Sequence, residues 1–128
     1  MRAVLVIVAG SIAMTGVASA ASIDIGGAYG DERGCAFAKK PEYTGENDFM
    51  LLTPTEWRTS VTGCDFAKVD VWQSGDLKRF IVTGLCASEG GGEITIDMMR
   101  IEKADDGSDS YVLFDANGNE MGRGKRCQ

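Results

Sequence analysis

The sequence predicts an all-β domain, either a small antiparallel β-barrel or a compact sandwich, that two disulfides staple together. Beyond residue 20, turn residues interrupt the chain at short intervals, and the runs between them are short and rich in β-branched and aromatic side chains. No long stretch keeps a helical period of 3.6 residues. All four cysteines lie beyond residue 20, and an even number of cysteines in a short exported chain indicates a disulfide framework.

The first twenty residues predict a secretory signal peptide. Arg2 supplies a positive start, residues 3–17 carry no charge, and Ala18-Ser19-Ala20 has the small side chains that signal peptidase requires. The apolar run is short for a membrane anchor and rich in Gly, Ala and Ser. We therefore expect cleavage after Ala20 and a single periplasmic domain over residues 21–128, without membrane insertion.

The clearest hairpin lies between Cys64 and Cys86. Apolar and polar side chains alternate over residues 66–72, Ser74-Gly75-Asp76 turns the chain, and residues 80–83 return it. Folding about Gly75 pairs residues whose numbers add up to 150, which sets Cys64 opposite Cys86 within reach of a disulfide. The remaining pair is then Cys35–Cys127. The two other connectivities stay open, because a bulge in the turn would shift the register.

Five further strands are expected, over residues 49–52, 57–61, 93–102, 111–114 and 120–126. Thr53-Pro54 makes a corner after the first of them. Asn117-Gly118 predicts a two-residue hairpin turn between the last two, with positive φ at both positions.

Two acidic turns, at residues 105–109 and 115–120, superficially resemble calcium loops. In the second, the glycine is the fourth residue, whereas an EF-hand loop places its glycine sixth. Ordinary turns explain both segments better. We therefore predict no metal site.

The charge and the absence of histidine narrow the classes of function. The chain has a net charge of −6, and cleavage would remove one positive residue, Arg2, leaving −7. An acidic surface repels nucleic acid and attracts basic proteins. Without histidine there is no Ser-His-Asp or Cys-His site, and oxidised cysteines offer neither a thiolate nor a zinc ligand. We expect a protein that is not an enzyme and uses no cofactor.

Two loops are candidates for binding a partner. Residues 88–93 combine Ser88 and Glu89 with three glycines, which suits a flexible recognition loop better than the positioned carboxylates of a glycosidase. Residues 108–111 join an acidic side chain to hydroxyls and an amphipathic ring, a mixture typical of protein-binding protrusions and also of the approach to an ordinary strand. The predicted partner-binding residues are Ser108, Asp109, Ser110, Tyr111, Ser88 and Glu89.

Motifs spread over nearly all of residues 21–128 resemble a group of small exported proteins of alphaproteobacteria. The matching residues are Gly-x-Tyr-Gly at 27–30, Cys35, Leu52-Thr53-Pro54, Trp57, Cys64-Asp65-Phe66, Cys86-x-x-Glu-Gly at 86–90 and Arg126-Cys127.

More broadly, the size, acidity, export and terminal cysteine are similar to those of bacterial periplasmic inhibitors of c-type lysozyme. Those inhibitors are small antiparallel β-barrels that insert a Ser-Gly-x-x-Tyr loop into the lysozyme cleft. The present chain departs from that pattern, because Ser108-Asp109-Ser110-Tyr111 keeps only a serine three residues before a tyrosine.

The leading functional hypothesis is therefore a periplasmic inhibitor of peptidoglycan hydrolases, with a basic protein such as lysozyme as its partner. One alternative is a small-ligand-binding module, which requires an apolar cavity lined by Trp57, Trp72, Met98 or Met99. The other is a structural envelope protein.

Overall fold

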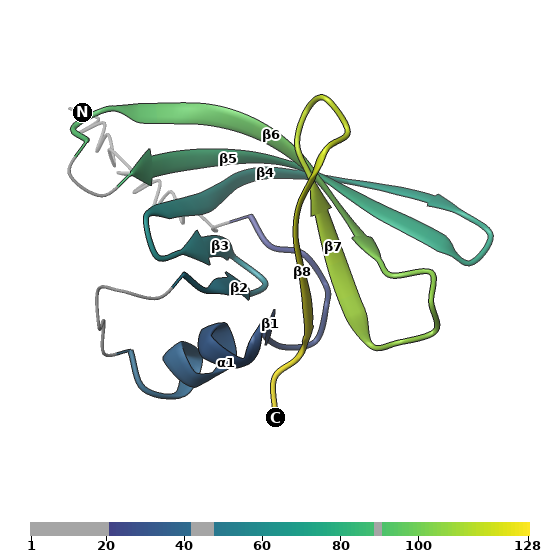
Figure 1. The fold of residues 1–128 in the computed structure, drawn as a ribbon. Coiled ribbons are helices and arrows are strands. Elements are labelled where there is room, and N and C mark those ends of the chain that lie inside the picture. Colours follow the sequence, from purple (N-terminus) through teal and green to yellow (C-terminus); the bar gives the residue numbers. More distant parts are fainter. Residues whose placement is uncertain (1–20, 42–47, 89–90) are drawn as a thin grey trace, which may run out of the picture.

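The computed structural model describes residues 21–41, 48–88 and 91–128. Its antiparallel strands close into one barrel in chain order, each pairing with the next and the last pairing with the first (Figure 1). The elements are β1 (Tyr29–Gly30), α1 (Glu32–Lys39), β2 (Met50–Leu52), β3 (Glu56–Thr59), β4 (Thr62–Ser74), β5 (Leu77–Ser88), β6 (Ile94–Lys103), β7 (Ser110–Phe114) and β8 (Glu120–Arg126). The predicted all-β class is confirmed, and of the two architectures the barrel is the one observed.

Large apolar side chains from all around the barrel fill its interior. The core includes Tyr29, Leu52, Trp57, Phe66, Phe80, Val82, Ile101 and Leu113. The segment before β1 also belongs to it, since Ile23 and Ile25 are buried and the Ile23 N–H donates to the carbonyl of Pro54 at 2.8 Å. Residues just after the predicted cleavage point are thus part of the folded domain.

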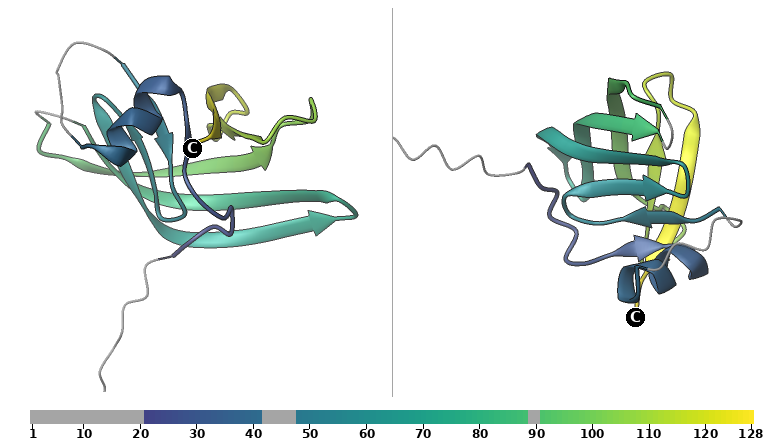
Figure 2. Two further views of the ribbon diagram at one scale, coloured as in Figure 1. Left: turned by 90° about the horizontal axis from the view of Figure 1, so that it is seen from below. Right: turned by 90° about the vertical axis from the view of Figure 1, so that its left-hand side faces the viewer.

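Helix α1 was not expected from the sequence. Asp31 caps its first turn by accepting a hydrogen bond from the Gly34 N–H at 2.6 Å, and Lys39 lies in the last turn. With eight residues, the helix is too short to show a repeating apolar period. It lies at one end of the barrel beside the C-terminus (Figure 2), to which the Cys35–Cys127 disulfide joins it. Among the described residues no helix has the length and apolar character needed to cross a membrane.

Both predicted disulfides are confirmed, although the argument for Cys64–Cys86 was only partly right. At the turn, Ser74 faces Leu77, so that paired residue numbers add up to 151. Gly75 there has a φ of +59°, a value that favours glycine. A β-bulge at Ala67 then takes up one residue, and Cys64 faces Cys86 with 4.0 Å between their Cα atoms. The register set by the turn alone would not place Cys64 opposite Cys86, and the bulge at Ala67 shifts it by the one residue needed.

The turn between β7 and β8 differs from the predicted two-residue type. The Gly118 N–H donates to the carbonyl of Asp115 at 3.0 Å, and Gly118 alone in this turn has positive φ. This is a type I turn followed by a left-handed glycine. The carboxylate of Asp115 accepts hydrogen bonds from the N–H groups of Asn117 and Asn119, both at 2.9 Å. These bonds hold the turn in a form in which Asn117 keeps a negative φ.

Candidate functional site

Strands β3 and β4 set two carboxylates side by side on the outside of the barrel. Along each strand the side chains alternate between the two faces of the sheet, so that Trp57 and Cys64 point inward while their neighbours Glu56 and Asp65 point outward. Glu56 lies directly opposite Asp65 in the register of the two strands. The pair is thus positioned by strands whose inner faces are fixed by the core.

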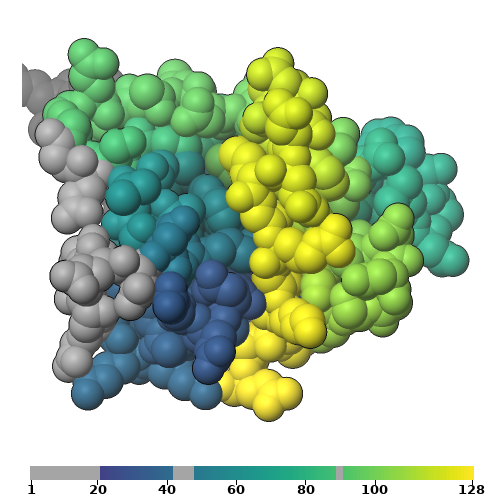
Figure 3. Space-filling model, viewed as in Figure 1, coloured from purple at the N-terminus to yellow at the C-terminus, as the bar shows by residue number. Residues whose placement is uncertain are grey.

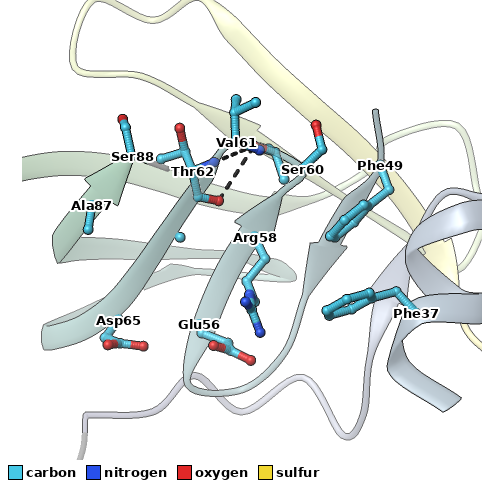
Figure 4. A pocket seen from close by; sticks show the side chains of 12 residues that line it. Phe37, Phe49, Glu56, Arg58, Ser60, Val61, Thr62, Asp65, Ala87 and Ser88 are labelled. Carbon is cyan, nitrogen blue, oxygen red and sulfur yellow. Dashed lines mark hydrogen bonds between the residues drawn. The ribbon is translucent and has the colours of Figure 1, made fainter. Parts of the chain in front are cut away.

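These carboxylates border an open groove of about 650 Å³, which we call the acidic groove. Figure 4 shows Phe37 and Phe49 on one side of it, Glu56 and Asp65 on another, and Arg58 between them. The rings of Phe37 and Phe49 stack with centroids 4.7 Å apart, and the Arg58 guanidinium lies 5.2 Å from the Phe37 centroid. The groove thus combines an aromatic wall with an acidic one.

Like charges placed directly opposite each other destabilise a strand pair. Among the residues that the structure describes, no cation forms an ion pair with Glu56 or Asp65. A cationic group arriving from outside would therefore meet two carboxylates that have no ion-pair partner among the described residues, although the Arg58 guanidinium lies in the same groove. Two carboxylates are too few for a metal centre, and no cluster of three or more metal-binding side chains occurs in the described part of the chain.

The turn between β3 and β4 forms a rigid rim of the groove. The hydroxyl oxygen of Thr59 accepts hydrogen bonds from the N–H groups of Val61 and Thr62, at 3.3 and 3.1 Å (Figure 4). The Ser60 hydroxyl donates to the carboxylate of Asp48 at 2.8 Å and ties the turn to the segment before β2. Val61 stands exposed at the tip, where a partner can contact it.

Of the two candidate loops, the first reaches the acidic groove. Ser88, the last residue of β5, lines it together with Ala87. Glu89 lies outside the described residues.

The second candidate loop lies elsewhere and is bonded largely within the protein. Ser110 is buried, and Ser108 forms hydrogen bonds with Ser110 and Asp106. Tyr111 is half-buried and packs edge-to-face on Tyr29, with centroids 4.7 Å apart. Asp109 accepts hydrogen bonds from the Tyr29 hydroxyl at 2.9 Å and from the Arg126 Nε at 2.6 Å.

The group formed by Tyr29, Asp109 and Arg126, here called the tyrosine latch, ties the start of the domain to β8. Burial, and then the hydrogen bond to Asp109, raise the pKa of Tyr29 to about 12. Hydrogen bonds from Arg126 and then from Tyr29 lower the pKa of Asp109. Around neutral pH the phenol therefore stays protonated and the carboxylate stays charged, so the latch is a structural device.

A second groove, of about 790 Å³, runs between α1 and β8 next to the Cys35–Cys127 disulfide. Figure 3 shows the helix (blue) and β8 (yellow) side by side on this face. Ser108 and Ser110 line this groove, so they and Ser88 belong to different grooves. Charges of both signs line it, with Asp31, Glu32 and Asp106 against Lys39, Arg123, Lys125 and Arg126. It therefore lacks the excess of acidic side chains over basic ones that the acidic groove has.

The residues expected to line an interior cavity are divided between the core and the surface. Trp57 and Met99 are buried in the core, whereas Trp72 and Met98 are exposed. Trp72 lies on the outer part of the β4–β5 hairpin, with the Arg79 guanidinium 5.0 Å from its ring. These four side chains therefore do not enclose a common site.

The four side chains that form the walls of the acidic groove were not among the residues predicted from the sequence: Phe37, Phe49, Glu56 and Asp65. The sequence does show an acidic residue next to an inward-pointing one in each strand, Glu56 beside Trp57 and Asp65 beside Cys64. Only the register between the two strands, however, sets Glu56 opposite Asp65. No protein-family model, curated protein or solved structure matches this chain.

Proposed function

We propose that the protein is a periplasmic inhibitor of peptidoglycan hydrolases, which binds a basic enzyme such as lysozyme through the acidic groove and obstructs the enzyme's cleft. The observation that supports it most is the pair of opposed carboxylates, Glu56 and Asp65, that lack an ion-pair partner among the described residues.

The groove has the chemistry to receive an arginine or lysine of the partner. The carboxylates would accept hydrogen bonds from its cationic end, in competition with the chain's own Arg58, whose guanidinium lies 5.2 Å from the Phe37 centroid, and the stacked rings of Phe37 and Phe49 would contact its stem. At longer range, the net charge of −6 would steer a basic protein toward the inhibitor.

The part of the inhibitor that enters the cleft is proposed to be the segment beginning at Ser88 and Glu89, because Ser88 lines the acidic groove. The loop with Ser108, Asp109, Ser110 and Tyr111 is the second candidate, and its binding would require some of its internal hydrogen bonds to be exchanged. The two disulfides constrain the barrel that carries either segment, which would limit the conformational entropy that the barrel itself loses on binding.

Lysis of peptidoglycan by lysozyme, measured with increasing amounts of the purified protein, tests the proposal. The wild-type protein is expected to inhibit. A variant carrying Glu56→Gln and Asp65→Asn is expected to inhibit about tenfold less well at low salt. The control carries Asp76→Asn and Asp105→Asn, which removes the same charge at exposed positions outside the groove and is expected to inhibit nearly as well as wild type. Full lysis in the presence of excess wild-type protein would rule the proposal out.

The runner-up is a small-ligand-binding module. Trp57, Trp72, Met98 and Met99 do not enclose the cavity expected for it, so its ligand would occupy the groove beside the Cys35–Cys127 disulfide instead. The groove's volume of about 790 Å³ is within the range of small-molecule sites. A ligand bound there would raise the melting temperature of a protein that does not inhibit lysozyme.

A further inference from the structure

Strand β6 has a free edge over its first half. On one side, Ile94–Glu102 pairs with β5, but on the other side β7 pairs only with Arg100–Lys103. Within the ranges that the structure describes, no strand pairs with residues 94–98 on that second side. This part of β6 forms the upper rim of the molecule in Figures 1 and 3.

The register of β6 shows which backbone groups line this free edge. The Ala104 N–H donates to the carbonyl of Ser110 at 2.8 Å, so even-numbered residues direct their backbone groups toward the side of β7. The pairing runs without a shift from Lys103 back to Ile94. The N–H and C=O groups of Ile94, Ile96 and Met98 therefore point to the free side.

The distance between the Cα atoms of the Cys64–Cys86 disulfide agrees with these directions of the β6 backbone groups. The Cα atoms of Cys64 and Cys86 are 4.0 Å apart, the close approach of a pair that exchanges no backbone hydrogen bonds. Cys86 therefore directs its backbone groups to β6, where its partner is Thr95. Odd-numbered residues of β6 thus face β5, and even-numbered ones face away from it.

The same three residues carry exposed apolar side chains. Ile94, Ile96 and Met98 are 70%, 71% and 54% exposed, and Leu85 of β5 lies exposed next to Ile96. Proteins usually protect an edge strand with charges, prolines or a bulge. In residues 94–98 Asp97 is the one charged side chain, and there is neither a proline nor a bulge. An open edge with an apolar face is a surface for adding a strand.

We infer that this edge binds a second copy of the same chain, with the two β6 strands antiparallel about a two-fold axis at Ile96. Ile96 then faces Ile96 of the partner copy, and Ile94 faces Met98 of the partner copy. Each of these pairs exchanges two backbone hydrogen bonds. The apolar side chains of both copies form one continuous face, and β4, β5 and β6 continue into the sheet of the partner copy.

The chemistry of the segment selects this register and a copy of itself as the partner. Only even-numbered residues offer free backbone groups, so each of them must face an even-numbered residue of the partner copy. This requires the two-fold axis to pass through a residue, and the residues near the centre of the segment are Thr95, Ile96 and Asp97. An axis at Asp97 would oppose two like charges, and an axis at Thr95 would leave Met98 without a partner in the segment. An axis at Ile96 pairs all three apolar residues and sets Thr95 opposite Asp97 of the partner copy.

The Thr95 hydroxyl, which donates to the Asp97 carboxylate of its own chain at 2.9 Å, would donate to Asp97 of the partner copy instead. When two copies of Ile-Thr-Ile-Asp-Met pair antiparallel about Ile96, apolar residues face apolar ones and Thr95 faces Asp97. The dimer edge and the acidic pair are separate, because neither Glu56 nor Asp65 lies on β6, although the segment that begins at Ser88 leads into this strand.

Sedimentation velocity over a concentration series, with both disulfides formed, tests the inference. A short strand pair buries little area, so we expect a reversible dimer with a dissociation constant of about 10–100 µM. Ile96→Lys opposes two cations at the axis and is expected to weaken the dimer about tenfold or more. The control is Val71→Lys, at a residue of β4 that is 56% exposed and remote from the edge in sequence and pairing, and it is expected to leave the dimer unchanged.

Thr95 tests the register itself. Thr95→Lys sets a cation opposite Asp97 of the partner copy and is expected to strengthen the dimer, whereas Thr95→Asp sets two carboxylates opposite each other and is expected to weaken it. Added salt is expected to strengthen the wild-type dimer, because it screens the repulsion of two acidic chains, and to weaken the binding of a basic enzyme. A wild-type protein that is monomeric at about 1 mM, or a dimer unaffected by Ile96→Lys, would overturn the inference.

Discussion

At the scale of single residues, Tyr29 takes part in several kinds of interaction at once. Its hydroxyl donates to Asp109 and accepts from Arg126, its ring packs on Tyr111, and the Arg126 guanidinium lies 4.9 Å from its centroid. Arg126 also donates to the carbonyl of Gly26 at 3.3 Å. Tyr29 and Arg126 together connect the segment before β1, the loop before β7, and β8.

Tyr29→Phe is expected to lower the free energy of unfolding by about 1–2 kcal/mol at neutral pH, because it removes a hydroxyl that is both donor and acceptor in a buried setting. The pH dependence is also expected to change. The pKa of Tyr29 is raised from 10.0 to about 12 in the folded protein. Its stabilising effect is complete below pH 10, where the phenol is protonated in both states, and is lost as the pH rises toward 12.

Urea unfolding at pH 8 and pH 11 measures both effects. Wild type is expected to lose more stability than Tyr29→Phe between the two values, because the variant lacks the group that titrates. An equal loss in both proteins would contradict the raised pKa.

At the scale of elements, α1 is held against β2 by a close approach at a glycine. A Cβ atom at Gly34 would overlap the carbonyl oxygen of Met50, which belongs to the backbone and cannot move independently. Helix packing this tight requires a residue without a side chain, whatever its intrinsic helix propensity.

Gly34→Ala therefore tests the packing of α1. In an exposed helix the change would stabilise by up to about 1 kcal/mol, but here it is expected to destabilise by about 1–3 kcal/mol. The urea midpoint measures it, with Gly92→Ala as the control, since a Cβ atom at Gly92 meets nothing within 4 Å. A midpoint equal to or above that of wild type would show that α1 can shift away from β2.

At the scale of the whole molecule, the two disulfides close loops of very different length. Cys35–Cys127 joins residues 92 apart and connects α1 to the end of the chain, whereas Cys64–Cys86 joins residues 22 apart within one hairpin. A disulfide raises the free energy of unfolding mainly by restricting the unfolded chain, and this contribution is larger for the longer loop.

Replacing both cysteines of a pair by alanine is expected to cost about 4.6 kcal/mol for Cys35–Cys127 and about 3 kcal/mol for Cys64–Cys86. Each double variant is the control for the other, and urea unfolding without reductant compares them. If the Cys64–Cys86 variant lost more stability, the packing of these two buried sulfurs would outweigh the restriction of the unfolded chain.

Local sequence signals were sufficient to predict the longer strands and their order along the chain. The turn at Gly75, the turn residues Asn117-Gly118 and the alternating runs between turns were each readable from neighbouring residues, and so were the spacing of the cysteines and the absence of histidine. The turns and alternating runs depend on backbone preferences over a few residues, whereas the cysteines, the charge and the lack of histidine are matters of composition, and together they predicted an acidic, disulfide-linked β domain.

Contacts between distant residues decided the rest. The two residues of β1 become a strand only because β2 and β8 flank them, and α1 is stabilised by its Asp31 cap, its packing on β2 and on Phe49, and one disulfide. The bulge at Ala67, the opposition of Glu56 and Asp65 and the free edge of β6 all follow from the register between strands. A strand's own residues do not specify that register, because it depends on what the neighbouring strands bury.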